Sequence, residues 1–400
     1  MNTFIDDISL KNNRTRESSI FSGALALYFC LISFDFFSVG SVGTILKLFA
    51  VVLIGAAFIY IANAKLIADG AFWGECIFLL ICVLSVVYSI KQSTSWSMMI
   101  TLILNYAMLM VCSLVPCSAW EVRTLKNALV SGSVIAAVLT FAFSDFSERG
   151  RLSITILDDT ADQNYLNGYL FFALGFFICS AIKTKKYRII KLLFCVGILY
   201  FTLLTGSRGA LLAEVAMILT ALFISVVKSG KKGKYIVLAV FGCLIFFLAF
   251  TYLLSVLPEE VAQRFSLEFL REENGSVRIE IWKALLNRFF GDNFFRIMFG
   301  QGIGTSGIYN PYDYHVAHNV FIDILVGTGI IGVSAYTAIY ALMFKKAWKS
   351  ENYPMVVILV GFLVMCMSLS LIAYKPIFNA FLFIEIFSRT YNRKRVTDGD

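Results

Sequence analysis

The chain has 400 residues, of which 59% are hydrophobic and only 15% are charged, and its mean hydropathy is +0.79. A single soluble core of this length cannot bury so much apolar surface, so these values exclude an ordinary soluble enzyme. A net charge of +8 would suit nucleic-acid binding in a soluble protein. Here the basic residues cluster in short segments between apolar runs, where they orient membrane helices, so we expect no nucleic-acid partner.

Long apolar runs recur along the whole chain. Runs of about 18 to 25 residues can cross about 30 Å of hydrocarbon as helices. The sequence therefore predicts an all-α fold, a polytopic membrane helix bundle with about twelve transmembrane helices, of which the last is short and could be re-entrant. The predicted spans are 20–39, 44–62, 71–90, 95–115, 127–144, 164–182, 190–206, 209–227, 235–256, 317–342, 354–373 and 376–388.

These spans divide the chain into three parts. Residues 1–256 hold spans 1–9, residues 257–316 form a long polar loop with a small helical cap, and residues 317–400 hold spans 10–12 and a basic tail. Of the 34 basic residues, 22 fall in segments that share one side, six fall in the long loop and six fall in the short segments of the other side. The positive-inside rule makes the side with 22 cytoplasmic and places the long loop outside the cytoplasmic membrane.

The cytoplasmic loops are too short to build a nucleotide-binding domain, and the sequence has no phosphate-binding P-loop motif. We therefore expect chemistry at the outer face and no nucleotide-driven pump. In the outer loop at 145–163, Asp158, Asp159 and Asp162 could bind a divalent cation, but capping of span 6 by Thr160 or Asp162 is favoured. No metal or other cofactor is expected.

A tight outward turn joins spans 7 and 8, with the sequence Gly206-Ser207-Arg208-Gly209. The arginine is either an anchor at the membrane surface or a ligand for an anion. Small neighbours such as Ser207 leave space for the oxygens of a ligand to reach the guanidinium and the first amides of span 8. The start of a helix favours phosphate.

The long loop contains an amphipathic helix over 277–289, in which Ile279, Trp282, Leu286 and Phe289 recur every three to four residues. Arg278 falls in its first turn, where a cation opposes the helix dipole, so a bound anion explains this residue better than helix stability does. The glycine-rich segment 299–307 follows. It is either a flexible linker or, through Gly302 and Gly304, a backbone cradle for a sugar or a diphosphate.

Both histidines, His315 and His318, lie within one helical turn at the start of span 10. In one interpretation they cap the helix at the membrane boundary, with His315 in water and His318 on the backbone amides of the span. In the other, His318 is a general base near neutral pH. Asp323, one of the acidic residues in or near apolar runs, could share its cavity or pair with it.

Several of these segments together resemble one family. The pattern His318-Asn319, nine residues, Gly329, two residues and Gly332 is similar to that of the O-antigen ligase and Wzy-type polymerase superfamily. The Thr205–Leu211 turn, the Arg278-x-x-x-Trp282 helix, the glycines at 300, 302 and 304 and the entry to span 6 at Asp162 resemble that family in the same order. The resemblance covers about 155 to 345.

The resemblance implies a GT-C-like membrane glycosyltransferase that takes a glycan from an undecaprenyl-diphosphate carrier on the outer side of the membrane. It further implies a metal-independent, inverting reaction, without a cofactor. Arg208 and Arg278 would bind the donor diphosphate, His318 would deprotonate the acceptor, and Asn319 would orient the imidazole or the glycan. Ser207, Gly302 and Gly304 are further candidates for substrate binding.

The acceptor is either another carrier-linked glycan, which makes the protein a polymerase, or lipid A-core, which makes it a ligase. We expect a polymerase, because such proteins are numerous and diverse. The resemblance also suggests a flippase and a chain-length regulator as partners. The alternative from another class is a transporter of lipid-linked glycans, which would place its polar residues near the midplane and show two related halves.

Overall fold

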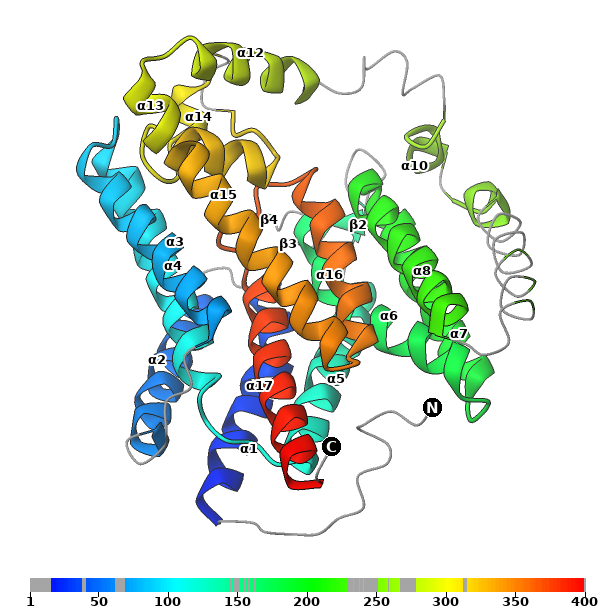
Figure 1. The fold of residues 1–400 in the computed structure, drawn as a ribbon. Helices are drawn as coiled ribbons and strands as arrows, with labels where there is room; N and C mark the ends of the chain where they lie inside the picture. The colour runs from blue at the N-terminus through cyan, green and yellow to red at the C-terminus, as the bar shows by residue number, and fades with distance from the viewer. Residues whose placement is uncertain are drawn as a thin grey trace.

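A computed structural model describes residues 16–37, 41–61, 69–143, 163–228, 251–257, 259–266, 278–311 and 315–398, with short pieces between 145 and 160 and single residues at 233, 237 and 240. The described chain forms a bundle of long helices with a cap of short helices over one end (Figure 1). Seven of the helices are long and apolar enough to cross a membrane. The predicted polytopic helix bundle is thereby confirmed.

Most of the long helices follow each other closely in the chain, whereas residues 229–319 separate α8 from α15. They are α1 Arg16–Leu31, α2 Ser41–Ile61, α3 Gly70–Val87, α4 Gln92–Cys112, α5 Ala119–Phe143, α6 Gln163–Lys183, α7 Arg188–Thr205, α8 Arg208–Lys228, α15 Val320–Lys349, α16 Tyr353–Cys366 and α17 Lys375–Asp398. A 3-10 helix, η1 Ile32–Phe37, follows α1. The short helices are α10 Glu259–Gln263, α12 Arg278–Phe290, α13 Phe294–Phe299 and α14 Ser306–Tyr309.

The bundle has an inner group of helices and a rim that faces outward. In α6, 72% of the apolar window is buried, and it packs on α7, α8, α5 and α16. In α3 the buried side chains, such as Phe78 and Cys82, lie on one face, whereas Trp73, Ile77 and Leu80 are exposed. Such exposed apolar faces suit contact with lipid, since the hydrocarbon solvates them.

Four strands of two residues each lie between α5 and α6. They are β1 Asp145–Phe146, which pairs antiparallel with β2 Leu152–Ser153, and β3 Thr155–Ile156, which pairs antiparallel with β4 Asp159–Thr160. The sequence did not predict them. Asp158 and Asp162 lie outside the described residues.

The structure corrects two details at the ends of the predicted spans. The helix that holds the short last span is longer than the span itself, because α17 has 24 residues and includes Arg389 and Arg393, which the sequence assigned to a tail. Span 10 begins at Val320 rather than at 317 and continues to Lys349. Most of the predicted span 235–256 lies outside the described residues, so the count of twelve and the three-part division of the chain stay predictions.

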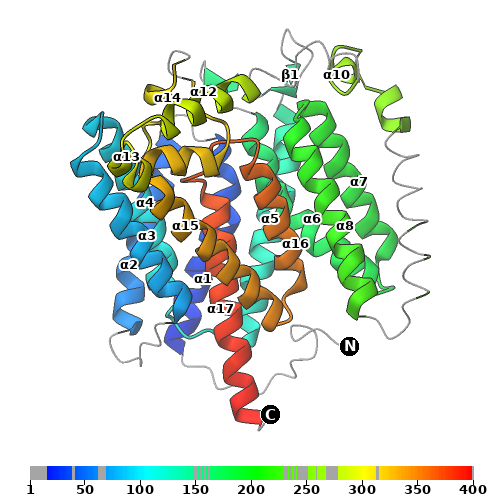
Figure 2. The ribbon, with the colours of Figure 1, turned by 45° about the horizontal axis from the view of Figure 1, so that its top comes forward.

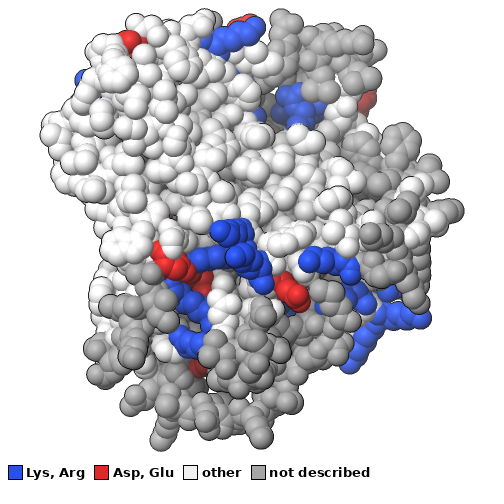
Figure 3. Space-filling view, viewed as in Figure 1, with Lys and Arg blue, Asp and Glu red and all other residues white. Residues whose placement is uncertain are grey.

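The two ends of the bundle differ in charge. Lys345, Lys346 and Lys349 end α15, Lys228 ends α8, and Arg389 and Arg393 lie in the last turns of α17. These helix ends lie together at the end of the bundle opposite the cap (Figure 2). On the face in Figure 3, a wide band without charged side chains separates the few basic groups near the cap from the larger group at this basic end.

Candidate functional site at the capped end

His318 lies in a strained turn immediately before α15. Its φ angle is +50°, a left-handed conformation that is unfavourable for a residue with a side chain and persists only where the surrounding structure enforces it. The next residue, Asn319, is the N-cap of α15, and its side-chain oxygen accepts hydrogen bonds from Phe321 N at 3.0 Å and Ile322 N at 3.3 Å. Asn319, and not His318, therefore caps this helix.

The residue before His318 is held from two sides. Ala317 N donates to Asp323 Oδ1 at 3.3 Å, and Ala317 O accepts from Trp282 Nε1 at 2.6 Å. Ser306 Oγ also donates to Asp323 Oδ1, at 2.5 Å. The buried Asp323 carboxylate thus fixes the backbone that leads into His318. His315 is exposed, as expected for a side chain that meets water.

Trp282 connects this turn to the helix that carries Arg278. Arg278 is the first residue of α12, and Trp282 follows one turn later. The predicted helix is confirmed, but its buried stripe is Ile281, Leu285 and Phe289, with Ile279 41% exposed. The stripe is therefore shifted by about one residue, roughly a quarter of a turn, from the predicted one, and Phe289 belongs to both. It packs on Tyr309, Ala317 and Val326, so α12 lies against the start of α15.

Arg208 occupies the predicted tight turn, which is confirmed. Helix α7 ends at Thr205, Gly206 takes φ +65° as its C-cap, and Arg208 opens α8. Ser207 is buried, and its carbonyl accepts from Leu211 N at 3.0 Å. The Arg208 side chain is partly exposed. Arg208 therefore lies at a helix N-terminus, where the backbone favours an anion.

A non-helical segment after α16 joins the Arg208 turn to the His318 turn. Asn319 Nδ2 donates to Met367 O at 3.3 Å. A side chain at Gly209 would meet Ser368 Oγ at 2.3 Å, so only glycine permits this approach of α8. The starts of α8 and α15 therefore contact consecutive residues. Together with the Trp282 contact, this brings the elements that carry Arg208, Arg278 and His318 to one end of the bundle.

A buried polar network joins α6, α7 and α8 next to the Arg208 turn. Thr202 Oγ1 lies 2.7 Å from Glu214 Oε1 and 3.0 Å from Asn167 Oδ1. Asn167 Nδ2 donates to Thr205 Oγ1 at 3.1 Å, and Thr205 Oγ1 donates to Thr202 O. Of these residues the sequence indicated Glu214, an acidic residue within an apolar run, and Thr205, the first residue of the Thr205–Leu211 turn. A buried asparagine in the apolar run of α6 was a signal that could have identified Asn167.

The glycine-rich segment is packed and is not a flexible linker, so that interpretation is wrong. Gly300, Gly302 and Gly304 all have positive φ angles. Gln301 N and Gly302 N donate to Val326 O and Gly327 O of α15 at 2.8 and 2.9 Å. On its other side the segment is tied to α3 and α4, since Ile303 N donates to Ser85 Oγ and Ser95 Oγ donates to Ile303 O. Substrate binding by Gly302 and Gly304 stays a prediction.

The contact between the glycine-rich segment and α15 lies next to a break in that helix. Gly329 has φ +69° and ψ −171°, which is not helical, and a side chain there would lie 2.2 Å from Met298 O in α13. At Gly329 the backbone of α15 therefore packs directly against α13 of the cap.

The cap is held by its own polar contacts. Arg288 Nη1 donates to Tyr309 O at 2.6 Å and its guanidinium lies 4.4 Å from the centre of the Tyr309 ring. Burial raises the pKa of Tyr309 to about 12, together with its hydrogen bond to Asp292. Burial alone would raise the pKa of Asp292. Hydrogen bonds from Asn293 N, Tyr309 and Gln301 nevertheless hold this pKa below its ordinary value. Arg288 is thus part of the cap and not a solvated loop charge.

Among the residues that the structure describes, no group of three or more His, Cys, Asp or Glu side chains could hold a metal ion. The sequence also suggests Ser276 as the cap of the 277–289 helix and Arg271 as a secondary candidate for ligand binding, and both lie outside those residues.

Comparison with known proteins supports the same part of the chain. Residues 193–337 match a family model described as O-antigen ligase. The resemblance to the O-antigen ligase superfamily is confirmed. The match includes Arg208, Arg278 and His318 and both glycines of the motif, and it ends before α16 and α17.

A curated relative carries the same description. An O-antigen ligase of Pseudomonas aeruginosa is 29% identical over 165 residues, which are 38% of this chain and 34% of the relative. The alignment thus spans about a third of that relative's length.

Proposed function

We propose that this protein transfers a glycan from a polyprenyl-diphosphate carrier to an acceptor hydroxyl at the capped end of the bundle, on the outer side of the cytoplasmic membrane. The observation that carries the proposal is the convergence of three elements. The starts of α8, α12 and α15 bring two arginines and one histidine to a single end of a membrane bundle. No nucleotide site is needed, because the carrier diphosphate is already the leaving group.

In the proposed reaction His318 accepts the proton of the acceptor hydroxyl. The acceptor oxygen attacks the anomeric carbon, and the bond between this carbon and the diphosphate oxygen breaks. The diphosphate leaves with the electron pair. Arg208 and Arg278 balance the charge that develops on it, which is where fixed cations lower the barrier most. A single displacement of this kind inverts the anomeric centre, and no step requires a metal ion.

The strained turn gives His318 a fixed position for this role. Asn319, Asp323 and Trp282 bind the backbone on both sides of it. Asn319 uses its oxygen for the helix cap and its amide for Met367, so we assign it the positioning of His318 rather than contact with the glycan. Such preorganisation keeps a general base within reach of the acceptor proton.

Two acceptors are compatible with this reaction. Ligation to lipid A-core is favoured here, because the family model and the curated relative both carry the description O-antigen ligase. Polymerisation onto a second carrier-linked glycan, which the sequence favoured, is the alternative.

The test uses cells that lack the gene and carry either the wild-type chain or His318→Ala. Glycans are separated on gels and probed for polymer length and for carrier-linked units. Long polymer that stays on its carrier in the mutant indicates a ligase, and single units on the final acceptor indicate a polymerase. We expect His318→Ala to lower transfer about 10²- to 10⁴-fold. Normal glycan in the His318→Ala strain, at equal protein level, would overturn the proposal.

A further inference from the structure

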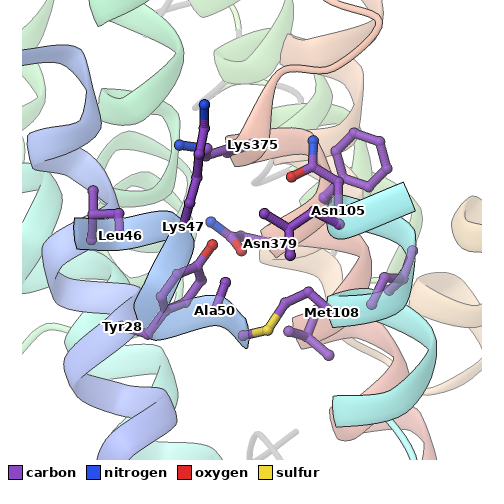
Figure 4. A pocket seen from close by; sticks show the side chains of 12 residues that line it. Tyr28, Leu46, Lys47, Ala50, Asn105, Met108, Lys375 and Asn379 are labelled. Carbon is purple, nitrogen blue, oxygen red and sulfur yellow. The ribbon is translucent and has the colours of Figure 1, made fainter. Parts of the chain in front are cut away.

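A narrow pocket lies between α1, α2, α4 and α17, on the far side of the segment that joins the Arg208 and His318 turns. The empty space at this site is about 360 Å³ when the open space at its mouth is included. Most of its wall is apolar, but Tyr28, Lys47, Asn105, Lys375 and Asn379 also line it (Figure 4). All five polar groups can donate hydrogen bonds. None of them belongs to the proposed transfer site.

Two of these groups are lysines at the less basic end of the bundle. Lys375 is the first residue of α17 and pairs with Asp35 of η1. Lys47 lies in the second turn of α2, where its neighbours Ile45, Leu48 and Val51 are 54–61% exposed. An ammonium group on a lipid-facing helix is costly without a counter-charge. No carboxylate among the described residues forms an ion pair with Lys47.

The third observation is a buried amide. Asn379 is 2% exposed, and its Nδ2 atom has no hydrogen-bond partner. A buried donor without a partner is destabilising, and native structures rarely leave one unless something else binds there. The nearby Asn105 is satisfied, because its Nδ2 donates to Ala373 O at 3.1 Å. Asn379 therefore offers its N–H groups to a ligand in the pocket.

We propose that this pocket binds the phosphate group of an anionic membrane lipid. Two ammonium groups, one amide donor and the Tyr28 hydroxyl match the oxygens of a phosphate ester, and the apolar wall suits the first carbons of a lipid chain. The depth of the two lysines in the membrane also suits a headgroup phosphate. Lys375 and Lys47 lie within about two turns of the ends of their helices, where long basic side chains reach the headgroups.

The lipid phosphate has two sources, an ordinary anionic phospholipid or a polyprenyl phosphate. The inference does not rest on the proposed transfer, because it concerns binding alone. Its position is nevertheless informative. The segment 367–375 runs from the contacts with Asn319 and Gly209 to Lys375 in this pocket. A bound lipid would thus stabilise the backbone that joins the Arg208 and His318 turns.

The experiment measures lipid retention by the full chain in detergent with native mass spectrometry. Phosphatidylglycerol, phosphatidylcholine and undecaprenyl phosphate are added separately to the wild type, Lys47→Gln and Asn379→Leu. Lys91→Gln is the matched control, because Lys91 is an exposed lysine in the turn between α3 and α4 at the same end of the bundle. Thermal unfolding without lipid shows that each variant is folded.

We expect the wild type and Lys91→Gln to retain phosphatidylglycerol or undecaprenyl phosphate, and both pocket variants to bind it about tenfold more weakly. Retention of phosphatidylglycerol identifies a leaflet lipid, and retention of undecaprenyl phosphate alone identifies the carrier. Asn379→Leu should unfold at an unchanged or higher temperature, since it removes an unsatisfied amide. Equal retention by all four proteins, or equal retention of phosphatidylcholine, would overturn the proposal.

Discussion

Buried carboxylates are held in different ways at the two ends of the bundle. At the basic end Lys346 Nζ lies 2.6 Å from Asp69 and also pairs with Glu385, which in turn faces Arg389. At the capped end Asp323 accepts from Ser306 and from Ala317 N, which are neutral donors. The comparison teaches that Asp69 and Glu385 at the basic end balance cations, whereas Asp323 at the capped end shapes the backbone around a candidate reacting group.

The largest effect is expected from the arginines of the capped end. Arg208→Lys and Arg278→Lys keep the charge but lose the planar fork that binds two phosphate oxygens at once. We expect each to lower glycan transfer about 10²- to 10³-fold, with an unchanged melting temperature. Transfer is measured on membranes with a carrier-linked donor. Arg288→Lys, a change within the cap, is the control, and loss of activity in the control alone would contradict the site.

At the basic end the expected loss is one of stability. Lys346→Met leaves Asp69 and Glu385 without their shared cation, and unpaired buried carboxylates are costly. We expect a loss of about 2–3 kcal/mol of unfolding free energy, because Asp69 is partly exposed, with unchanged transfer per folded molecule. The measurement is chemical unfolding in detergent. Lys349→Met, an exposed lysine at the same helix end, should have no effect, and equal losses in both variants would refute the ion-pair account.

A smaller effect on transfer is expected from Asp323→Asn. The amide can present its N–H₂ group to Ala317 N, which then loses its acceptor, so the turn that holds His318 loosens. We expect transfer to fall about tenfold, with a melting temperature close to that of the wild type. Thr337→Val, which changes an exposed residue of the same helix, is the control. Full activity of Asp323→Asn would mean that the carboxylate does not position His318.

The smallest effect concerns the cap in acid. Because the pKa of Asp292 is held below its ordinary value of 3.8, its hydrogen bonds stabilise the cap above that value, and this stability is lost as the pH falls through the lower folded pKa. Amide hydrogen exchange in α12–α14, corrected for its intrinsic pH dependence, should therefore rise only below about pH 4. Asp292→Asn should remove this pH dependence of the exchange. A pH dependence that remains after the substitution would mean that another group causes it.

The sequence predicted those features that depend on local pattern. The apolar runs gave the helices, and Gly206 and Ser207 between two runs gave the tight turn before Arg208. One of the two interpretations of His318 made it the capping group of α15, although asparagine is the stronger N-cap residue and Asn319 takes that place. Long-range contacts could not be predicted in this way. The contact of Gly209 with Ser368 and that of Trp282 with Ala317 join residues far apart in the chain, and no local periodicity records them.

The break at Gly329 also determines where the His318 turn lies relative to the membrane. The 30 residues of α15 would extend about 45 Å as one straight helix, which is longer than the hydrocarbon core is thick. The part from 330 to 349 alone is about 30 Å long and matches that thickness. The nine residues from 320 to 328 then lie at the interface. The part of α15 from 330 to 349 thus holds the His318 turn at the membrane surface, which is the level at which the diphosphate of the proposed carrier-linked donor would meet a lipid-anchored acceptor.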